Sequence, residues 1–239
     1  MERPKIQWGF LQFTVVLGAL VLLMPELTGA RFRFLFREIF LLCAVIATSK
    51  AIQRRPQFSS ALWAIWGVGA ILAVAEKFPQ FAAWHNEMGA VRLLLSAVIG
   101  FACAVEILRY VFEHLHGGID SIFGSIVAYM MIVHMFAQLY GMLLFWDPTC
   151  FRFPDEMPLV ERIIQGELLY FSLSTITTLG YGDIVPVTQT ARGVAMIEAI
   201  TGQFYMGVIV ATLAGIFAEN PDRLRGKGRS RHSETDSPA

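Results

Sequence analysis

The sequence is poor in charged residues, which make up 16% of its 239 positions, whereas hydrophobic residues make up 55%. The 19 basic and 19 acidic side chains cancel, so the charge gives no indication of nucleic-acid binding. Cysteines are also few: Cys43 and Cys103 lie in apolar stretches and Cys150 in a polar one, which predicts no intrachain disulfide framework. With a mean hydropathy of +0.55, this composition is typical of an integral membrane protein.

Long apolar stretches predict six membrane-spanning helices, because one crossing takes about 20 apolar residues. They cover 6–24, 34–51, 59–75, 88–112, 119–146 and 191–218. The second stretch depends on Arg37 extending toward the lipid headgroups. Little of the chain is left over, so we expect no additional domain of ordinary size, which needs on the order of 100 residues.

A shorter apolar segment, 168–177, cannot cross the membrane and runs directly into Thr-Leu-Gly-Tyr-Gly-Asp at 178–183. Irregular backbone is tolerated at membrane depth only where protein buries it or where it lines an aqueous path. Gly180 and Gly182 stand at alternate positions, where a positive φ costs little and lets successive carbonyl groups face the same way. We therefore predict a re-entrant pore helix and a loop whose carbonyl groups bind a dehydrated monovalent cation.

Residues 177–183, Thr-Thr-Leu-Gly-Tyr-Gly-Asp, closely resemble the selectivity-filter signature of the potassium channel family. The resemblance extends over about 119–218 and implies that K+ is the bound ion, with no organic cofactor. It implies that backbone carbonyl groups and one threonine hydroxyl bind K+ within this filter: Thr178, Leu179, Gly180, Tyr181 and Gly182.

The same resemblance implies supporting residues behind the filter. Asp183 is expected to accept a hydrogen bond from an aromatic residue of the pore helix. Many family members have tryptophan there, whereas this chain has Tyr170 and Phe171, of which Tyr170 retains a hydroxyl donor. Ser174 occupies the position at which some bacterial members carry a buried glutamate, and Thr177 directly precedes the filter.

One filter loop cannot enclose an ion, so the resemblance implies a homotetramer around a central axis. The dipole of each pore helix would place partial negative charge at that axis, which favours a cation. The expected partners are therefore further copies of the chain and membrane lipid. A regulatory protein or lipid is left open, and nucleic acid is not expected.

Three residues of the last helix are candidates for gating or ion attraction. Gly202 lies 19 residues after Asp183, at the spacing of the family's hinge glycine, and Gly207 offers a second bend point. Small residues at these positions would equally allow close helix packing. Glu198 is an acid inside a predicted span, and it either faces the ion path or pairs with a hydroxyl of Thr175 or Thr177.

The chain divides into three predicted units: a four-helix membrane unit (1–118), a pore domain (119–218) and a disordered basic cytoplasmic tail (219–239). The pore domain comprises the outer helix, pore helix, filter and inner helix. A voltage sensor carries a basic residue at every third position, whereas 88–112 holds only Arg92 and Arg109, so we expect little intrinsic voltage gating.

The combined expectation is an all-α, non-enzymatic, potassium-selective channel that conducts passively. The resemblance is to bacterial members and implies a prokaryotic cell membrane protein. The distribution of basic residues favours both termini in the cytoplasm, although the bias is weak. Two alternatives stay open: a weakly selective cation channel of the same fold, which the intact Gly-Tyr-Gly opposes, and a non-conducting membrane partner subunit or scaffold. An intramembrane hydrolase is disfavoured because His134 has no serine or cysteine in a strained turn nearby.

Overall fold

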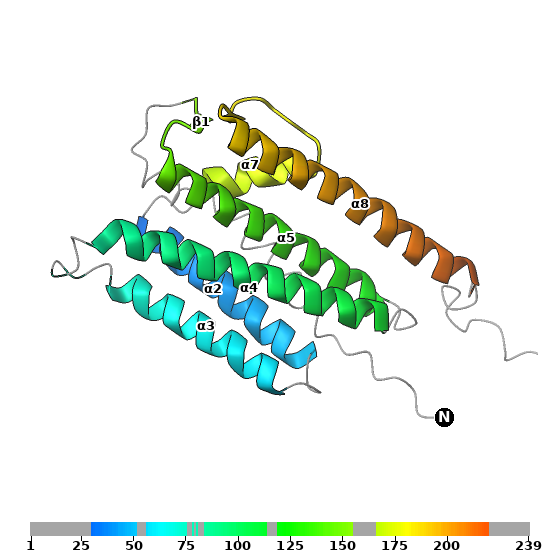
Figure 1. Ribbon diagram of the computed structural model, residues 1–239. Helices are drawn as coiled ribbons and strands as arrows, with labels where there is room; N and C mark the ends of the chain where they lie inside the picture. The colour runs from blue at the N-terminus through cyan, green and yellow to red at the C-terminus, as the bar shows by residue number, and fades with distance from the viewer. Residues whose placement is uncertain are drawn as a thin grey trace, which may run out of the picture.

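The computed structural model describes residues 30–51, 56–75, 78, 80, 84–113, 119–154 and 166–219. Its helices are α2 (Ala30–Ala51), α3 (Pro56–Ala75), α4 (His85–Glu113), α5 (Ile119–Trp146), α7 (Glu167–Ile176) and α8 (Gln189–Glu219). Two short strands, β1 (Phe151–Arg152) and β2 (Val185–Pro186), complete the elements shown in Figure 1. The predicted first span and the tail beyond 219 lie outside the described residues.

The described helices follow the predicted apolar stretches closely. The bounds of α5 are those predicted, and the other long helices extend one to four residues beyond the apolar part. An apolar stretch marks only the part of a helix that is suited to contact with lipid. The helix itself continues until its backbone hydrogen bonding is interrupted. At the start of α3, Pro56 occupies the first helical position, where its missing N–H costs nothing.

Among the described residues, three helices are long and apolar enough to cross a membrane: Gln57–Ala75, Glu87–Glu113 and Ser121–Trp146. The helical membrane architecture is therefore confirmed for these three. In addition, α2 has 22 residues and α8 has 31, or about 33 and 46 Å at about 1.5 Å per residue. Both lengths exceed the hydrocarbon core of a bilayer, which is about 30 Å thick.

The helices α4 and α5 form the centre of the arrangement in Figure 1, with α2 and α3 on one side and α8 on the other. Glycines allow the central pair to approach closely: a Cβ at Gly100 would lie 3.3 Å from the carbonyl oxygen of Met131, and one at Gly141 would lie 3.1 Å from Leu93. Small residues at helix contacts are the usual means of packing in lipid.

One hydrophobic core extends across the whole described part of the chain. It begins at Phe40 in α2, continues through Ile107 in α4 and Tyr140 in α5, and reaches Ile176 in α7 and Ala191 in α8. The predicted boundary after residue 118 therefore separates two units that share a core. Because α7 contacts both α5 and α8, the pore helix is held between the outer and inner helices.

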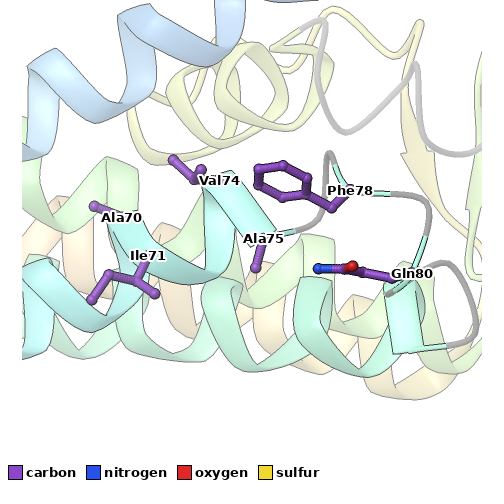
Figure 2. A pocket seen from close by; sticks show the side chains of 6 residues that line it. All are labelled: Ala70, Ile71, Val74, Ala75, Phe78 and Gln80. Atoms are coloured by element: carbon purple, nitrogen blue, oxygen red, sulfur yellow. The ribbon is translucent and has the colours of Figure 1, made fainter.

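The outer face of α3 is apolar and open. Figure 2 shows the end of this helix, where Ile71 and Val74 stand beside Phe78 and Gln80 around a shallow apolar groove. Ile71 is 69% exposed and Val74 is 54% exposed. Such exposure of large apolar side chains is suited to contact with lipid.

Candidate functional site

The segment that follows α7 folds back onto the end of that helix. The backbone N–H of Thr178 donates to the carbonyl of Thr175 at 3.0 Å, and that of Gly180 donates to the carbonyl of Ser174 at 3.1 Å. These bonds satisfy carbonyl groups that the helix end would leave without partners. The filter loop, residues 178–182, is therefore anchored directly on the last turn of the pore helix.

The backbone of the filter loop alternates in handedness. Thr178, Gly180 and Gly182 have φ values of 61°, 56° and 80°, whereas the intervening residues are not among those with positive φ in the described chain. An alternation of this kind can turn successive carbonyl groups toward one side, which is the arrangement expected from the two glycines. The left-handed conformation of Thr178 was not predicted, since a β-branched residue rarely adopts it and its type gives no signal for it. Strain of this kind is typical of functional sites.

The filter loop lies on an open face of the single chain. Leu179 is 61% exposed and Tyr181 is 67% exposed, and a Cβ added at Gly180 would meet nothing within 4 Å. The same chain exposes large apolar side chains on α8: Met196, Ile197, Ile200, Phe204, Met206 and Val208. Within one chain, nothing in the described residues closes a ring around the filter carbonyls.

Tyr170 and Asp183 form the contact that the sequence predicts behind the filter. The Tyr170 hydroxyl donates to Oδ2 of Asp183 at 2.7 Å, and the backbone N–H of Ile184 donates to Oδ1 at 3.0 Å. The Tyr170 ring also stacks on that of Tyr181, with centroids 6.1 Å apart and planes 2° apart. Since the Tyr170 hydroxyl stabilises the charged carboxylate, it lowers the pKa of Asp183 below its ordinary value.

Replacing Tyr170 with phenylalanine should raise the pKa of Asp183 toward its ordinary value, because the stabilising hydroxyl is lost. A carboxyl group whose pKa is lowered by folding contributes stability at neutral pH, and this is lost as the pH falls through the lowered pKa. Acid should therefore reduce K+ flux at a higher pH in Tyr170→Phe than in the unchanged protein. An acidic pH series measures this, with Asp147→Asn as control, since within the described residues the Asp147 carboxylate bonds Thr149 and no filter residue. Coincident profiles would contradict the prediction.

Glu198 of α8 is fully buried, with 0% of its surface exposed. Its carboxyl group makes short hydrogen bonds with the hydroxyl groups of Tyr140 on α5 and Ser172 on α7. Of the two interpretations left open by the sequence, pairing with a pore-helix hydroxyl is the one that the structure shows. The partner on that helix is Ser172, and neither Thr175 nor Thr177 bonds the acid.

Gly202 of α8 is buried where the inner helix crosses the end of the pore helix. A Cβ added at Gly202 would overlap the carbonyl oxygen of Ile176 and lie 2.6 Å from its Cγ1. Gly207, by contrast, has nothing within 4 Å of an added Cβ. The two predicted hinge glycines therefore differ: Gly202 makes a close helix contact, and Gly207 has open space beside it.

Comparison with known proteins shows which proteins the segment around the filter loop resembles. The family described as "Ion channel" matches residues 130–219, which include the filter loop and its flanking helices. A calcium-gated potassium channel, TvoK, of Thermoplasma volcanium is 37% identical over 59 residues, covering 25% of this chain. The voltage-gated potassium channel Kch of Escherichia coli is 31% identical over 111 residues, covering 46% of this chain. Residues 130–219 are therefore similar to ion channels, and parts of the chain are similar to these two potassium channels.

The match to these potassium channels is partial in length. The aligned segments span 17% of TvoK and 23% of Kch, so this chain covers less than a quarter of either relative. No solved structure matches the chain.

Two features around the filter loop were not anticipated from the sequence. Strands β1 and β2 pair antiparallel, with Phe151 opposite Pro186, and tie the segment after α5 to the exit of the filter. The all-α expectation is wrong for this short pair, because extended two-residue strands leave no periodic signal. Ser174, predicted as filter support, keeps its hydroxyl on the carbonyl of Phe171 and contacts the filter through its own carbonyl.

The filter loop offers oxygen atoms as possible ligands. No cluster of three His, Cys, Asp or Glu side chains that could hold a metal ion occurs in the described part of the chain. Cys150, beside β1, is a buried free thiol. The oxygen atoms of the filter loop are those of its backbone and of the Thr178 and Tyr181 hydroxyl groups.

Proposed function

We propose that the chain forms a passive, potassium-selective channel. The observation that carries this proposal is the alternating positive φ of Thr178, Gly180 and Gly182. Such a backbone presents a row of carbonyl oxygens that can replace the hydration shell of K+. The proposed ion sites are the carbonyl groups of Thr178, Leu179, Gly180 and Tyr181, with Gly182 completing the loop.

The ion path requires several copies of the chain, and we propose a homotetramer with four filter loops around its axis. The open face of the single chain supports this, because it combines an exposed filter with the exposed apolar side chains of α8. We further propose six spans per subunit in a cell membrane, with both termini cytoplasmic. The lipid-suited face of α3 and the lengths of α2 and α8 support a multi-span subunit.

We propose that the four-helix unit, residues 1–118, is not a working voltage sensor. Moving one charge through 100 mV supplies only about 2.3 kcal/mol, so a sensor needs several mobile charges. Arg109 instead pairs with Glu106 of the same helix at 2.9 Å. A gating current corresponding to several charges per tetramer would contradict this part of the proposal.

The deciding experiment is ion flux from liposomes that contain the purified protein, with K+ and Na+ gradients tested separately. Flux of K+ well above that of Na+ is the expected result. Equal flux of the two ions would instead favour the weakly selective channel, which has the same fold and differs in its degree of selectivity. No flux from correctly assembled tetramers would overturn conduction and favour the non-conducting partner subunit.

A further inference from the structure

Glu198 connects three helices through a single carboxyl group. It belongs to the inner helix α8, and it bonds Tyr140 on the outer helix α5 and Ser172 on the pore helix α7. Glu198, Tyr140 and Ser172 are each 0% exposed. An acid so placed does not face an aqueous path within its own subunit, so it acts on the helices that surround it.

Counting protons at Ser172 gives the charge state of the acid. The Ser172 oxygen lies 2.9 Å from the carbonyl oxygen of Val133 as well as beside Oε1 of Glu198. A serine hydroxyl has one hydrogen, and a carbonyl oxygen can only accept. If Ser172 donates to Val133, the proton between Ser172 and Glu198 must come from the acid. The hydroxyl of Tyr140 then donates to Oε2, and every contact is satisfied.

An ionised Glu198 would fit this site poorly. Ser172 would then have two acceptors and one hydrogen, so it could not donate to Val133 and to Glu198 at the same time. The hydrogen-bond partners of the carboxyl group in the described chain are the two hydroxyl groups, and no cation is among them. A buried charge without a cationic partner is costly, which favours the neutral acid.

We propose that Glu198 is a positioning residue that, as a neutral carboxylic acid, ties the pore helix to the outer and inner helices and thereby holds the filter in its selective geometry. The mechanical link is short, since Ser172 and Ser174 belong to the same helix and the carbonyl of Ser174 accepts the N–H of Gly180. A displacement of α7 therefore moves the filter. This inference rests on the proposed channel function.

Two substitutions of Glu198 separate a neutral hydrogen-bonding role from a space-filling role. Glu198→Gln keeps one donor for Ser172 and one acceptor for Tyr140, so the ratio of K+ to Na+ flux should stay within about twofold of the unchanged protein. Glu198→Met keeps the volume but loses both bonds, and the ratio should fall at least about tenfold, because the loss of one buried hydrogen bond already has an effect of about this size. An unchanged ratio in Glu198→Met, or an equal loss in Glu198→Gln, would overturn the positioning role.

A serine pair tests the same link from the pore helix, which keeps the proposal testable if Glu198→Met fails to assemble. Ser172→Ala should lower the K+ to Na+ ratio, because it removes the hydroxyl between α7 and Glu198. Ser125→Ala is the matched control: Ser125 is also buried, but its hydroxyl bonds only Ile122 of its own helix at 2.7 Å. Equal ratios in Ser172→Ala and Ser125→Ala would contradict the link.

Infrared spectroscopy tests the neutral acid without any measurement of flux. At neutral pH, the difference between the unchanged protein and Glu198→Gln should contain the carbonyl stretch of a protonated carboxylic acid. A carboxylate band in its place would overturn the neutral state. Loss of K+ selectivity in the unchanged protein would instead overturn the proposed function, and the infrared result would be unaffected by that outcome.

Discussion

Replacing Gly180 with valine should reduce K+ flux to the level of empty liposomes. Gly180 has a φ of 56°, and a Cβ there would meet nothing within 4 Å in its own subunit, so the obstacle is backbone conformation and not a clash. A left-handed conformation costs a residue with a Cβ about 1–2 kcal/mol, or about 4–8 kcal/mol over the four subunits of the proposed tetramer. A β-branched side chain fits this region especially poorly. The peptide plane should therefore rotate and remove a carbonyl from the ion path.

The matched control for this prediction is Gly67→Val. Gly67 lies in α3, also has open space around an added Cβ, and is not among the residues with positive φ. The K+ flux of Gly67→Val should remain close to that of the unchanged protein. Circular dichroism should show equal helix content for Gly67→Val and Gly180→Val. Retention of more than about a tenth of the K+ flux by Gly180→Val would show that the loop does not form the ion path, since the expected cost exceeds 1.4 kcal/mol.

Much of the pore could be predicted because its signals are local. The bounds of α5 follow from one long, predominantly apolar stretch, and those of α7 differ by one residue from the predicted 168–177. The contact of Tyr170 with Asp183 was expected from the resemblance to the potassium channel family, and residue type then selected Tyr170, since only one aromatic residue at the two candidate positions carries a hydroxyl donor. The helix bounds need only residue type and spacing within a short segment.

The contacts of Glu198 could not be predicted because they depend on how three helices rotate about their axes. Ser172 and Ile176 are one turn apart on α7, and both are buried against neighbouring helices. Thr177, one of the two predicted partners, lies beyond the last residue of α7 and bonds back to Leu173. Tyr140 precedes Glu198 by 58 positions, a separation at which sequence spacing carries no information about contact.

The second large effect is expected at Gly202, in the contact between α8 and α7 to which Glu198 also belongs. Glu198 and Gly202 are one turn apart on α8, and they contact Ser172 and Ile176, which are one turn apart on α7. Residues four positions apart share a helix face, so the acid and the glycine form one contact surface against the pore helix. Gly202 provides the close approach that brings Glu198 within reach of Ser172.

Gly202→Ala should therefore destabilise the protein, although alanine is a better helix former than glycine by about 1 kcal/mol. The added methyl group would overlap backbone atoms of Ile176, and overpacking of this kind costs about 1–3 kcal/mol. Because backbone cannot rotate away as a side chain can, α8 must move from α7. The midpoint of thermal unfolding in detergent should fall, and K+ selectivity should fall with it as Glu198 loses Ser172.

Gly207→Ala is the control that separates close packing from a hinge. An added Cβ at Gly207 meets nothing within 4 Å, so its thermal midpoint should stay equal or rise with the better helix propensity of alanine. If Gly202 acts only as a hinge, both substitutions should stiffen α8, leave stability equal or higher and alter only the opening of the channel. A lower midpoint in Gly202→Ala alone therefore assigns Gly202 to the contact between the inner helix and the pore helix.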